Sequence, residues 1–420
     1  MKKLFVVFMS VVILLSLAGC AQPSVVASDK ERNTSPNVEE TDLDILSDGN
    51  NSFALDLYQA LKAENEGNLF YSPYSISSAL AMTYAGARGE TEKQMADTLH
   101  FTLSQDRLHP AFNSVSLALA SRGQETGDLD KMGFILKNIN AIWGQRNYNF
   151  QSAFLDTIAE NYGAGMRVLD FAGEPEKSRL TINNWVSEQT ANKIRELLPE
   201  RSIDASTFLV LTNAIYFKAK WFYMFDEKMT KDGQFDLLNG SKVTAPMMHQ
   251  TEYFDYAEGD GYQAVELLYR NRKLSMVILL PEQGQFEKFE GSLNYEQLEG
   301  IIDKLESRQV ILSMPKFGFD SKFNLKQTLS NMGMPIAFSG GADFSGIAEG
   351  GGFIGGVYHD AFVAVDEKGT EAGAATAVVI AKAAPGGPVE FTMGKPFIFL
   401  IRDIETNTVL FVGRVLNPLE

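Results

Sequence analysis

Four histidines are the residues with the widest scope for acid–base or metal chemistry in this chain: His100, His109, His249 and His359. They are widely spaced, no His-Glu-x-x-His pattern occurs, and a single cysteine cannot form a Cys pair. Because zinc sites need three or four clustered ligands, the sequence predicts no metal site. No Gly-x-Ser-x-Gly elbow and no Gly-x-x-x-x-Gly-Lys loop occurs either, so we expect neither an enzyme nor a cofactor.

Phosphate-bearing partners are also disfavoured. Gly350, Gly352 and Gly355 match Gly-x-Gly-x-x-Gly, but they precede a strand-like run instead of following a strand and opening a helix, as a nucleotide site requires. The formal net charge is −16, and such an acidic surface repels nucleic-acid backbones. We therefore expect no nucleic-acid partner.

The segment that stands out is a run of small residues near the C-terminus. Between Thr370 and Ala377, seven of eight residues are Thr, Ala or Gly. Read as a strand, one face carries only small side chains, namely Thr370, Ala372, Ala374 and Thr376. The opposite face carries Glu371, Gly373 and Ala375. A strand with these faces could lie over a crowded core, whereas Pro385 and Pro388 favour an exposed, extended distal end.

Helical patterns dominate the first half of the chain. Phe53, Leu57 and Leu61 recur every four residues, as one face of a helix requires. Ser72 before Pro73 predicts the start of a helix over 74–85, and Thr91 with Gln94 predicts a capping box for a helix through residue 99.

Strand patterns dominate after about residue 205. β-branched and aromatic runs bounded by Gly, Pro, Asn or Asp occupy residues 208–217, 275–280, 310–314, 361–365, 397–401 and 408–412. Helices followed by strands, without regular alternation, predict an α+β fold. No second linker interrupts the pattern, so residues 48–420 are predicted to form one domain.

Several of these segments together resemble the serpin family. Residues 365–377 (VDEKGTEAGAATA) resemble the hinge of the reactive-centre loop of an inhibitory serpin. The resemblance extends in order along the chain through residues 68–82, 86–95, 212–221, 342–346, 395–402 and 411–418. It implies the serpin fold, with helices packed around a large central mixed β-sheet, two smaller sheets and an exposed reactive-centre loop.

The function implied by the resemblance is suicide inhibition of a serine protease, which becomes the covalent partner of a monomeric inhibitor. The protease forms an acyl-enzyme with the loop, and the cleaved loop then inserts as a strand into the main sheet. Some 16 inserted residues at about 3.3 Å each would carry the protease roughly 50 Å. The hinge residues are Glu367, Gly369, Thr370, Ala372, Gly373, Ala374, Ala375 and Thr376. The alternative is a non-inhibitory serpin that acts as a carrier or chaperone.

Further site residues follow from the same resemblance. The family's polar "shutter" under the sheet matches Ser72, Ser75, Asn213 and His359, and the "breach" where insertion starts matches Trp221. Ordinary core roles for His359 and Trp221 are compatible with the sequence.

The usual loop length places the reactive bond at Ala383–Ala384, which would suit an elastase-like or subtilisin-like protease. Lys382, one residue earlier, would instead suit a trypsin-like enzyme.

The N-terminus predicts export and lipid attachment. Lys2 and Lys3 precede an apolar run that ends in Leu-Ala-Gly-Cys20, which resembles a bacterial lipobox. We expect residues 1–19 to be a signal peptide and Cys20 to carry a lipid that holds the protein on the outer face of the cell membrane or envelope. The polar segment 20–47 is predicted to be an unstructured tether.

Overall fold

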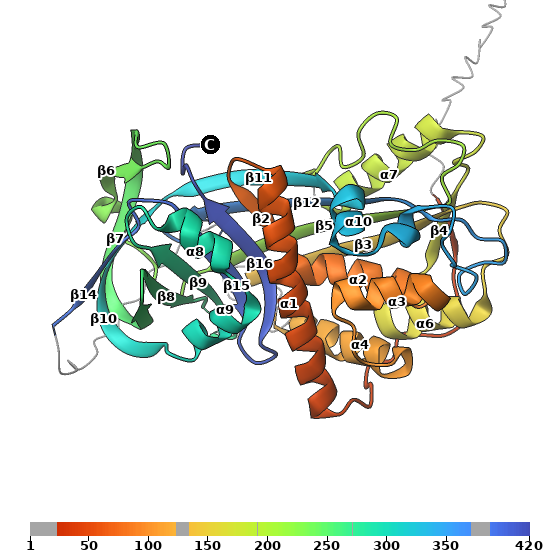
Figure 1. Ribbon diagram of the computed structural model, residues 1–420, viewed down its shortest axis with the longest axis horizontal. Coiled ribbons are helices and arrows are strands. Elements are labelled where there is room, and N and C mark those ends of the chain that lie inside the picture. The colour runs from red at the N-terminus through yellow and green to blue at the C-terminus, as the bar shows by residue number, and fades with distance from the viewer. Residues whose placement is uncertain (1–22, 123–133, 191, 271, 371–386) are drawn as a thin grey trace, which may run out of the picture.

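The structure is a computed structural model that describes residues 23–122, 134–190, 192–270, 272–370 and 387–420. Figure 1 shows helices on both sides of a sheet of long strands, with a second sheet at the left-hand end of the molecule. The α+β fold class predicted from the sequence is confirmed.

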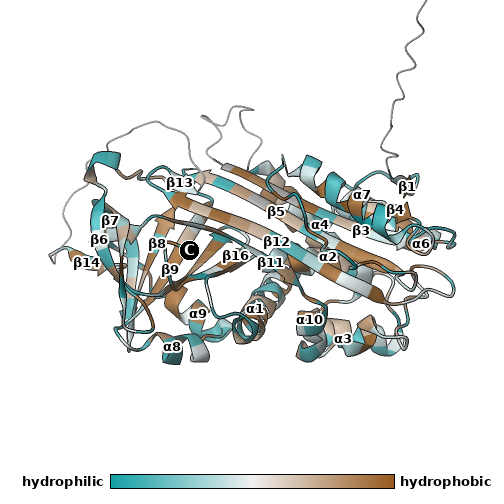
Figure 2. Ribbon diagram, turned by 90° about the horizontal axis from the view of Figure 1, so that it is seen from above, coloured by the Kyte–Doolittle hydropathy of each residue, from teal (hydrophilic) through white to brown (hydrophobic). Residues whose placement is uncertain are grey.

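The first sheet has seven strands in the order β1-β4-β3-β5-β13-β12-β11. Their bounds are β1 Ser24–Val26, β4 Met166–Leu169, β3 Phe134–Gln145, β5 Leu209–Lys220, β13 Gly369–Thr370, β12 Ile354–Asp366 and β11 Phe317–Asn324. β5 and β12 pair in parallel along residues 354–361 of β12, and the short β13 lies between them at one end, antiparallel to both. Figure 2 shows β13 at this end of the long strands.

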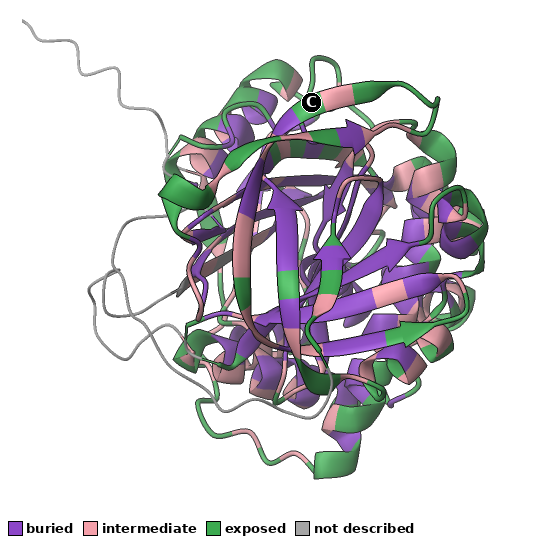
Figure 3. Cartoon of the chain, turned by 90° about the vertical axis from the view of Figure 1, so that its left-hand side faces the viewer, coloured by how far each residue is buried: buried purple, intermediate pink, exposed green. Residues whose placement is uncertain are grey.

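The second sheet has nine strands, of which eight follow the order β14-β10-β7-β8-β9-β15-β16-β2, while β6 pairs with β7. Their bounds are β14 Val389–Thr392, β10 Glu306–Pro315, β7 Lys242–Gly259, β8 Tyr262–Leu268, β9 Leu274–Pro281, β15 Phe397–Asp403, β16 Thr408–Val415, β2 Leu69–Tyr71 and β6 Lys231–Asp236. The pairing of β7 with β8 joins the two smaller sheets implied by the resemblance into one continuous sheet. Figure 3 shows buried residues running along these strands.

The helices of the described residues surround these sheets. Their bounds are α1 Glu40–Glu64, α2 Pro73–Tyr84, α3 Gly89–Leu99, α4 Gln105–Ser121, α6 Ser152–Tyr162, α7 Pro175–Gln189, α8 Phe286–Ser292, α9 Tyr295–Ile302 and α10 Lys326–Met332, with 3-10 turns η1 Glu227–Met229 and η2 Pro335–Phe338.

Both faces of the seven-stranded sheet are covered by apolar layers. On one face lies α2, every residue of which is buried. On the other face α7 contributes Ile182 and Val186 to a cluster that includes Trp143 and Phe171. A strand added to the middle of this sheet must therefore fit between two packed layers.

The start of α2 is as predicted from Ser72 and Pro73. The Ser72 hydroxyl accepts a hydrogen bond from the backbone N–H of Ser75 at 3.3 Å, and Pro73 occupies the first turn. The capping box predicted for α3 is wrong, because this helix begins earlier, at Gly89. The Thr91 hydroxyl accepts instead from the backbone N–H of Asp343.

The prediction of an unstructured tether up to residue 47 is wrong from residue 23 onward. β1 pairs antiparallel with β4, and α1 begins at Glu40, so ordered structure starts well before residue 48. The Arg32 guanidinium donates to Asn113 and Ser116 of α4. A polar segment can be ordered in this way because an open sheet edge supplies backbone hydrogen-bond partners that composition does not reveal.

Candidate functional site

The hinge residues Gly369 and Thr370 form β13 and already lie between two strands of the seven-stranded sheet. Gly369 pairs with Asp366 of β12 and with Lys220 of β5. Its φ is +152°, and a Cβ at this position would lie 1.9 Å from the carbonyl oxygen of Ala219. The close approach of these backbones therefore requires glycine.

The chain that leads into the hinge is held by Glu367. Lys316 Nζ lies 2.8 Å from Glu367 Oε2, and the Thr230 hydroxyl donates to Oε1 at 2.7 Å. Burial alone would raise the pKa of the Glu367 carboxyl, but the hydrogen bonds from Lys316 and Thr230 outweigh burial and hold this pKa below its usual value. The Glu367 carbonyl also accepts from the backbone N–H of Phe225 at 2.9 Å. The residues before β13 are thus fixed by charge and by backbone bonds.

Trp221 lies beside the hinge, as the resemblance implied for a residue at the entry point. Its indole N–H donates to the carbonyl of Asp366 at 3.0 Å, and its ring stacks on Tyr269 with centroids 4.7 Å apart. The Tyr269 hydroxyl lies 2.8 Å from the hydroxyl of Thr370. Sequence reasoning missed Tyr269, since it follows β8 in the other sheet and no local motif marks it.

The four predicted shutter residues form one buried hydrogen-bonded cluster. Ser72 N–H donates to His359 Nε2 at 3.1 Å, so this nitrogen is an acceptor and Nδ1 carries the proton. Nδ1 therefore donates to the Asn213 carbonyl oxygen, while the Asn213 amide donates to Ser75 Oγ and to Asn140 Oδ1. Asn140 of β3 was not predicted. It completes the cluster because β3 is the neighbour of β5, a pairing that only the sheet topology reveals.

The neutral state of the His359 ring has an electrostatic cause. The side chain is fully buried, and burial lowers the pKa of His359 to about 3, so the ring is neutral at physiological pH. Asn213 and His359 are direct partners in the parallel pairing of β5 with β12. Their side-chain hydrogen bond therefore links β5 to β12, and the two strands cannot part here without breaking this bond.

The geometry of this region suits strand addition. β13 separates β5 from β12 at one end, and β5 and β12 pair directly with each other farther along. β5 and β12 diverge around the hinge, and farther along the shutter cluster links them through Asn213 and His359. Such a wedge can accept more of the chain that follows Thr370 if the strands part in sequence from this end.

Several predicted site residues lie outside the described residues. They are Cys20, Ala372, Gly373, Ala374, Ala375, Thr376, Lys382, Ala383 and Ala384. The described chain leaves the seven-stranded sheet at Thr370 and resumes at Gly387, before β14 in the nine-stranded sheet. The segment that contains the predicted reactive bond therefore connects the two sheets.

Two kinds of feature are absent from the described residues. Within residues 23–122, 134–190, 192–270, 272–370 and 387–420, no group of three or more His, Cys, Asp or Glu side chains could hold a metal ion. In the same part of the chain, no helix has the length and apolar character needed to cross a membrane.

Comparisons with known proteins agree with the geometry. The family model described as serpin (serine protease inhibitor) matches residues 48–418. A serpin-like protein of Thermococcus kodakarensis is 39% identical, covering 98% of each chain. The leukocyte elastase inhibitor of Sus scrofa is 40% identical, covering 89% of this chain and 99% of its own.

Solved structures show the same fold. Uncleaved ovalbumin superposes with a TM-score of 0.78 at 29% identity, covering 89% of this chain and all of ovalbumin. The thermophilic serpin tengpin in its native state superposes with a TM-score of 0.80 at 27% identity, covering 94% of this chain and all of tengpin. The chain belongs to the serpin family, whose members are generally protease inhibitors, with non-inhibitory exceptions such as ovalbumin.

Proposed function

We propose that this serpin inhibits serine proteases by trapping the acyl-enzyme while its cleaved loop inserts between β5 and β12. The observation that carries the proposal is the position of β13, because the first two residues of the inserting strand are paired with both flanking strands. The hinge is thus aligned for further insertion before any cleavage occurs.

The register of β13 predicts the pairing partners of each residue that would insert after it. Thr370 pairs with Val365 of β12 and Ala219 of β5, so an antiparallel strand continued from it would place residue 376 between His359 and Asn213. Thr376 has a short side chain that fits this point and a hydroxyl that could replace the hydrogen bond lost there. The same count places Ala375 between Asp360 and Ala214.

The alternation of small residues suits both covering layers. Thr370, Ala372, Ala374 and Thr376 would face the layer that contains α2, and the alternate positions would face the layer that contains α7. Bulky or charged residues facing the α2 layer would slow insertion and let the acyl-enzyme hydrolyse. Thr370 is already paired, so insertion of the 13 residues from Glu371 to Ala383 would lengthen the strand by roughly 43 Å and carry the covalently attached protease with it.

The target class follows from the predicted reactive bond. Ala383 would fit a shallow primary pocket, such as that of an elastase-like or subtilisin-like enzyme. The 40% identity with a leukocyte elastase inhibitor supports this choice over a trypsin-like enzyme recognising Lys382.

The experiment is an incubation of the purified protein with pancreatic elastase, subtilisin and trypsin, each analysed on denaturing gels. We expect a covalent band at the summed mass with elastase or subtilisin. Mass spectrometry should show that the released C-terminal peptide begins at Ala384. Cleavage without any covalent band would contradict inhibition. It would favour the non-inhibitory alternative, a carrier or chaperone, for which the structural similarity to ovalbumin is the supporting observation.

The proposal for location is separate. We infer from the N-terminal sequence that Cys20 is lipid-modified and that the protein is exported and held on the outer face of the membrane or envelope. In a bacterial expression host, Cys20→Ala should abolish incorporation of labelled palmitate and release the protein from the membrane fraction. Equal membrane retention of both proteins would contradict a lipid anchor.

A further inference from the structure

Asp360 is a buried carboxyl group in the strand that borders the insertion site. It lies in β12 next to His359, and its backbone pairs with Ala214 of β5 on one side and Lys322 of β11 on the other. It is 1% exposed. Because side chains alternate along a strand, Asp360 points away from the shutter and shares a face with Tyr358, which packs in the α7 cluster.

The carboxyl group is poorly compensated. Among the described residues its Oδ2 finds no hydrogen-bond partner, and its ion pair with Lys322 Nζ is long, at 3.5 Å, and involves a side chain that is half exposed. Asp320, also on β11, adds a repulsive charge. The partner on β5 is Ala214, which offers neither charge nor hydrogen bond.

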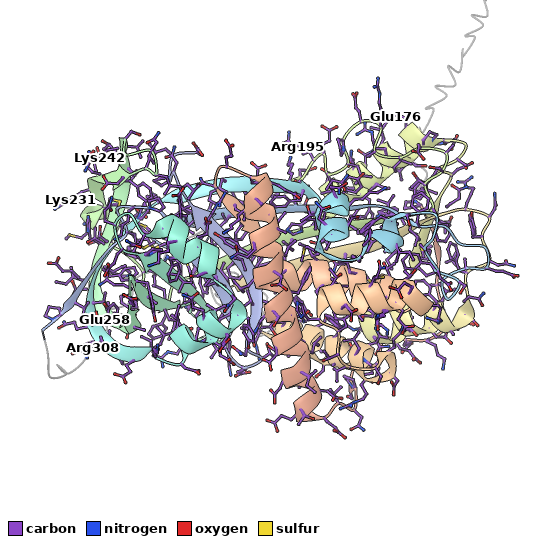
Figure 4. The ribbon with its side chains drawn as sticks, in the orientation of Figure 1. Glu176, Arg195, Lys231, Lys242, Glu258 and Arg308 are labelled. Atoms are coloured by element: carbon purple, nitrogen blue, oxygen red, sulfur yellow. The ribbon has the colours of Figure 1, made fainter. Side chains whose placement is uncertain are left out.

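The layer that covers this face does not supply the missing partner. The Arg179 guanidinium of α7 is engaged by Glu176, Glu196 and the Leu198 carbonyl. Lys193 lies over the ring of Phe362, two residues along from Asp360. Glu176 and Arg195 project outward from the molecule (Figure 4).

Burial of an ionised carboxylate with so little compensation is unfavourable. Burial is also the main reason that the pKa of Asp360 is raised to about 6, with Lys322 opposing and Asp320 adding to the shift. Above this pH the closed sheet therefore contains a buried Asp360 carboxylate, which would be more stable in contact with water. When β5 and β12 part, water gains access to this charge.

We propose that the buried charge of Asp360 lowers the barrier to parting of β5 and β12, and so sets the rate at which the sheet takes up the inserting strand. This inference rests on the proposed function, because it concerns the step in which the loop enters the sheet. It assigns Asp360 a positioning role, since it acts through the sheet and does not contact the protease.

The pH dependence has a definite sign. In the closed sheet the carboxyl retains its proton up to about pH 6, whereas in the opened sheet its pKa returns toward the usual 3.8. Opening is therefore favoured increasingly from about pH 4 to pH 6 and constantly above that range. His359, on the opposite face, has the reverse effect, because opening would let it gain a proton below about pH 6.5. The ratio of wild type to an Asp360 variant cancels this second contribution.

The test measures uptake of a synthetic peptide with the sequence of residues 371–383 by the purified protein, without protease, from pH 4.5 to pH 8. At pH 4.5 the rate of peptide uptake by the isosteric Asp360→Asn variant should match that of wild type within about threefold. At pH 7.5 the variant should take up the peptide at least about tenfold more slowly than wild type. The pKa shift limits this difference in rate to roughly 100-fold. Lys322→Met removes the compensating cation, so uptake should become about threefold faster than wild type at pH 8. A merely structural role would slow uptake in both variants.

Asp232→Asn is the matched control, because it removes the same charge from an exposed position on β6 of the other sheet; uptake should stay within about twofold of wild type. Equal uptake by wild type and Asp360→Asn at every pH would overturn the role of Asp360 and leave the proposed function standing. Failure of every protein to take up the peptide would overturn both, because the sheet would then not accept a strand at all.

Discussion

The hydroxyl oxygens of Tyr269 and Thr370 lie 2.8 Å apart in a buried position, although the two residues are 101 positions apart in the sequence. Tyr269 follows β8 of the nine-stranded sheet, and Thr370 ends β13 in the seven-stranded sheet. The stack of Trp221 on Tyr269 fixes the tyrosine ring. The first inserted side chain is therefore held by a specific partner as well as by backbone pairing.

Tyr269→Phe should loosen the hinge. The substitution leaves the Thr370 hydroxyl buried without this partner, so we expect a loss of about 1 kcal/mol of unfolding free energy and faster proteolysis near residue 370. Thermal unfolding and limited proteolysis measure the two effects. Tyr295→Phe is the control, because the hydroxyl of Tyr295 bonds to the exposed Asp48 and its loss should cost less than about 0.5 kcal/mol. Equal effects of the two substitutions on unfolding and proteolysis would contradict a stabilising role for the contact between Tyr269 and Thr370.

Thr370→Arg should convert the inhibitor into a substrate. A guanidinium cannot enter the buried space where Thr370 is 1% exposed without a large desolvation penalty, so insertion should stall after cleavage. Denaturing gels should show cleaved protein and no covalent complex. Thr370→Ser keeps a small side chain with a hydroxyl, and its complex should persist. Survival of the complex in the arginine variant would contradict insertion at this site.

His359 should make the protein sensitive to mild acid. Its pKa is lowered to about 3 in the folded protein, so the unfolded chain binds more protons between pH 3 and pH 6.5. Unfolding free energy should therefore decrease as pH falls through this range, with about 3 kcal/mol lost between pH 6.5 and pH 4 from this residue. Chemical denaturation at several pH values, for wild type and His359→Gln, should show a shallower dependence in the variant.

Lys316→Met should weaken the anchoring of the hinge. Without the Lys316 ammonium, the largely buried carboxylate of Glu367 keeps only the Thr230 hydroxyl as a side-chain partner among the described residues. The unfolding free energy should therefore fall by about 1–2 kcal/mol at pH 7. Because the pKa of Glu367 is lowered in the folded protein, this contribution is present above the unfolded value near 4.5 and is lost as pH falls below it. The difference between wild type and variant should therefore shrink in acid. Lys368→Met, which loses only the exposed Glu227, is the control and should change stability little.

Local patterns in the sequence predicted the elements that depend on neighbouring residues. The start of α2 at Ser72 and Pro73 and the strand at β5 were both identified, because a cap and a β-branched run act over a few positions. The resemblance added the four shutter residues, which the structure brings into one cluster.

The features that the sequence did not predict depend on long-range contacts. Asn140 joins the shutter only because β3 pairs with β5, and Tyr269 meets Thr370 across 101 positions of sequence. The order of residues 24–26 depends on the free edge of β4, which no composition rule describes. The burial of Asp360 within β12 depends on the tertiary packing around the sheet, which no local pattern predicts.

The position of β1 bears on how a target protease would meet this molecule. If Cys20 carries the lipid, as proposed above, four Cα steps separate the lipid from Ser24, which is at most about 15 Å. So short a connection would keep the sheet edge formed by β1 and β4 close to the lipid headgroups. Figure 1 shows β4 and β14 at opposite ends of the long axis, and β14 follows the reactive loop directly. With the proposed lipid on Cys20, the strand that follows the predicted reactive bond would lie at the end of the molecule far from the membrane.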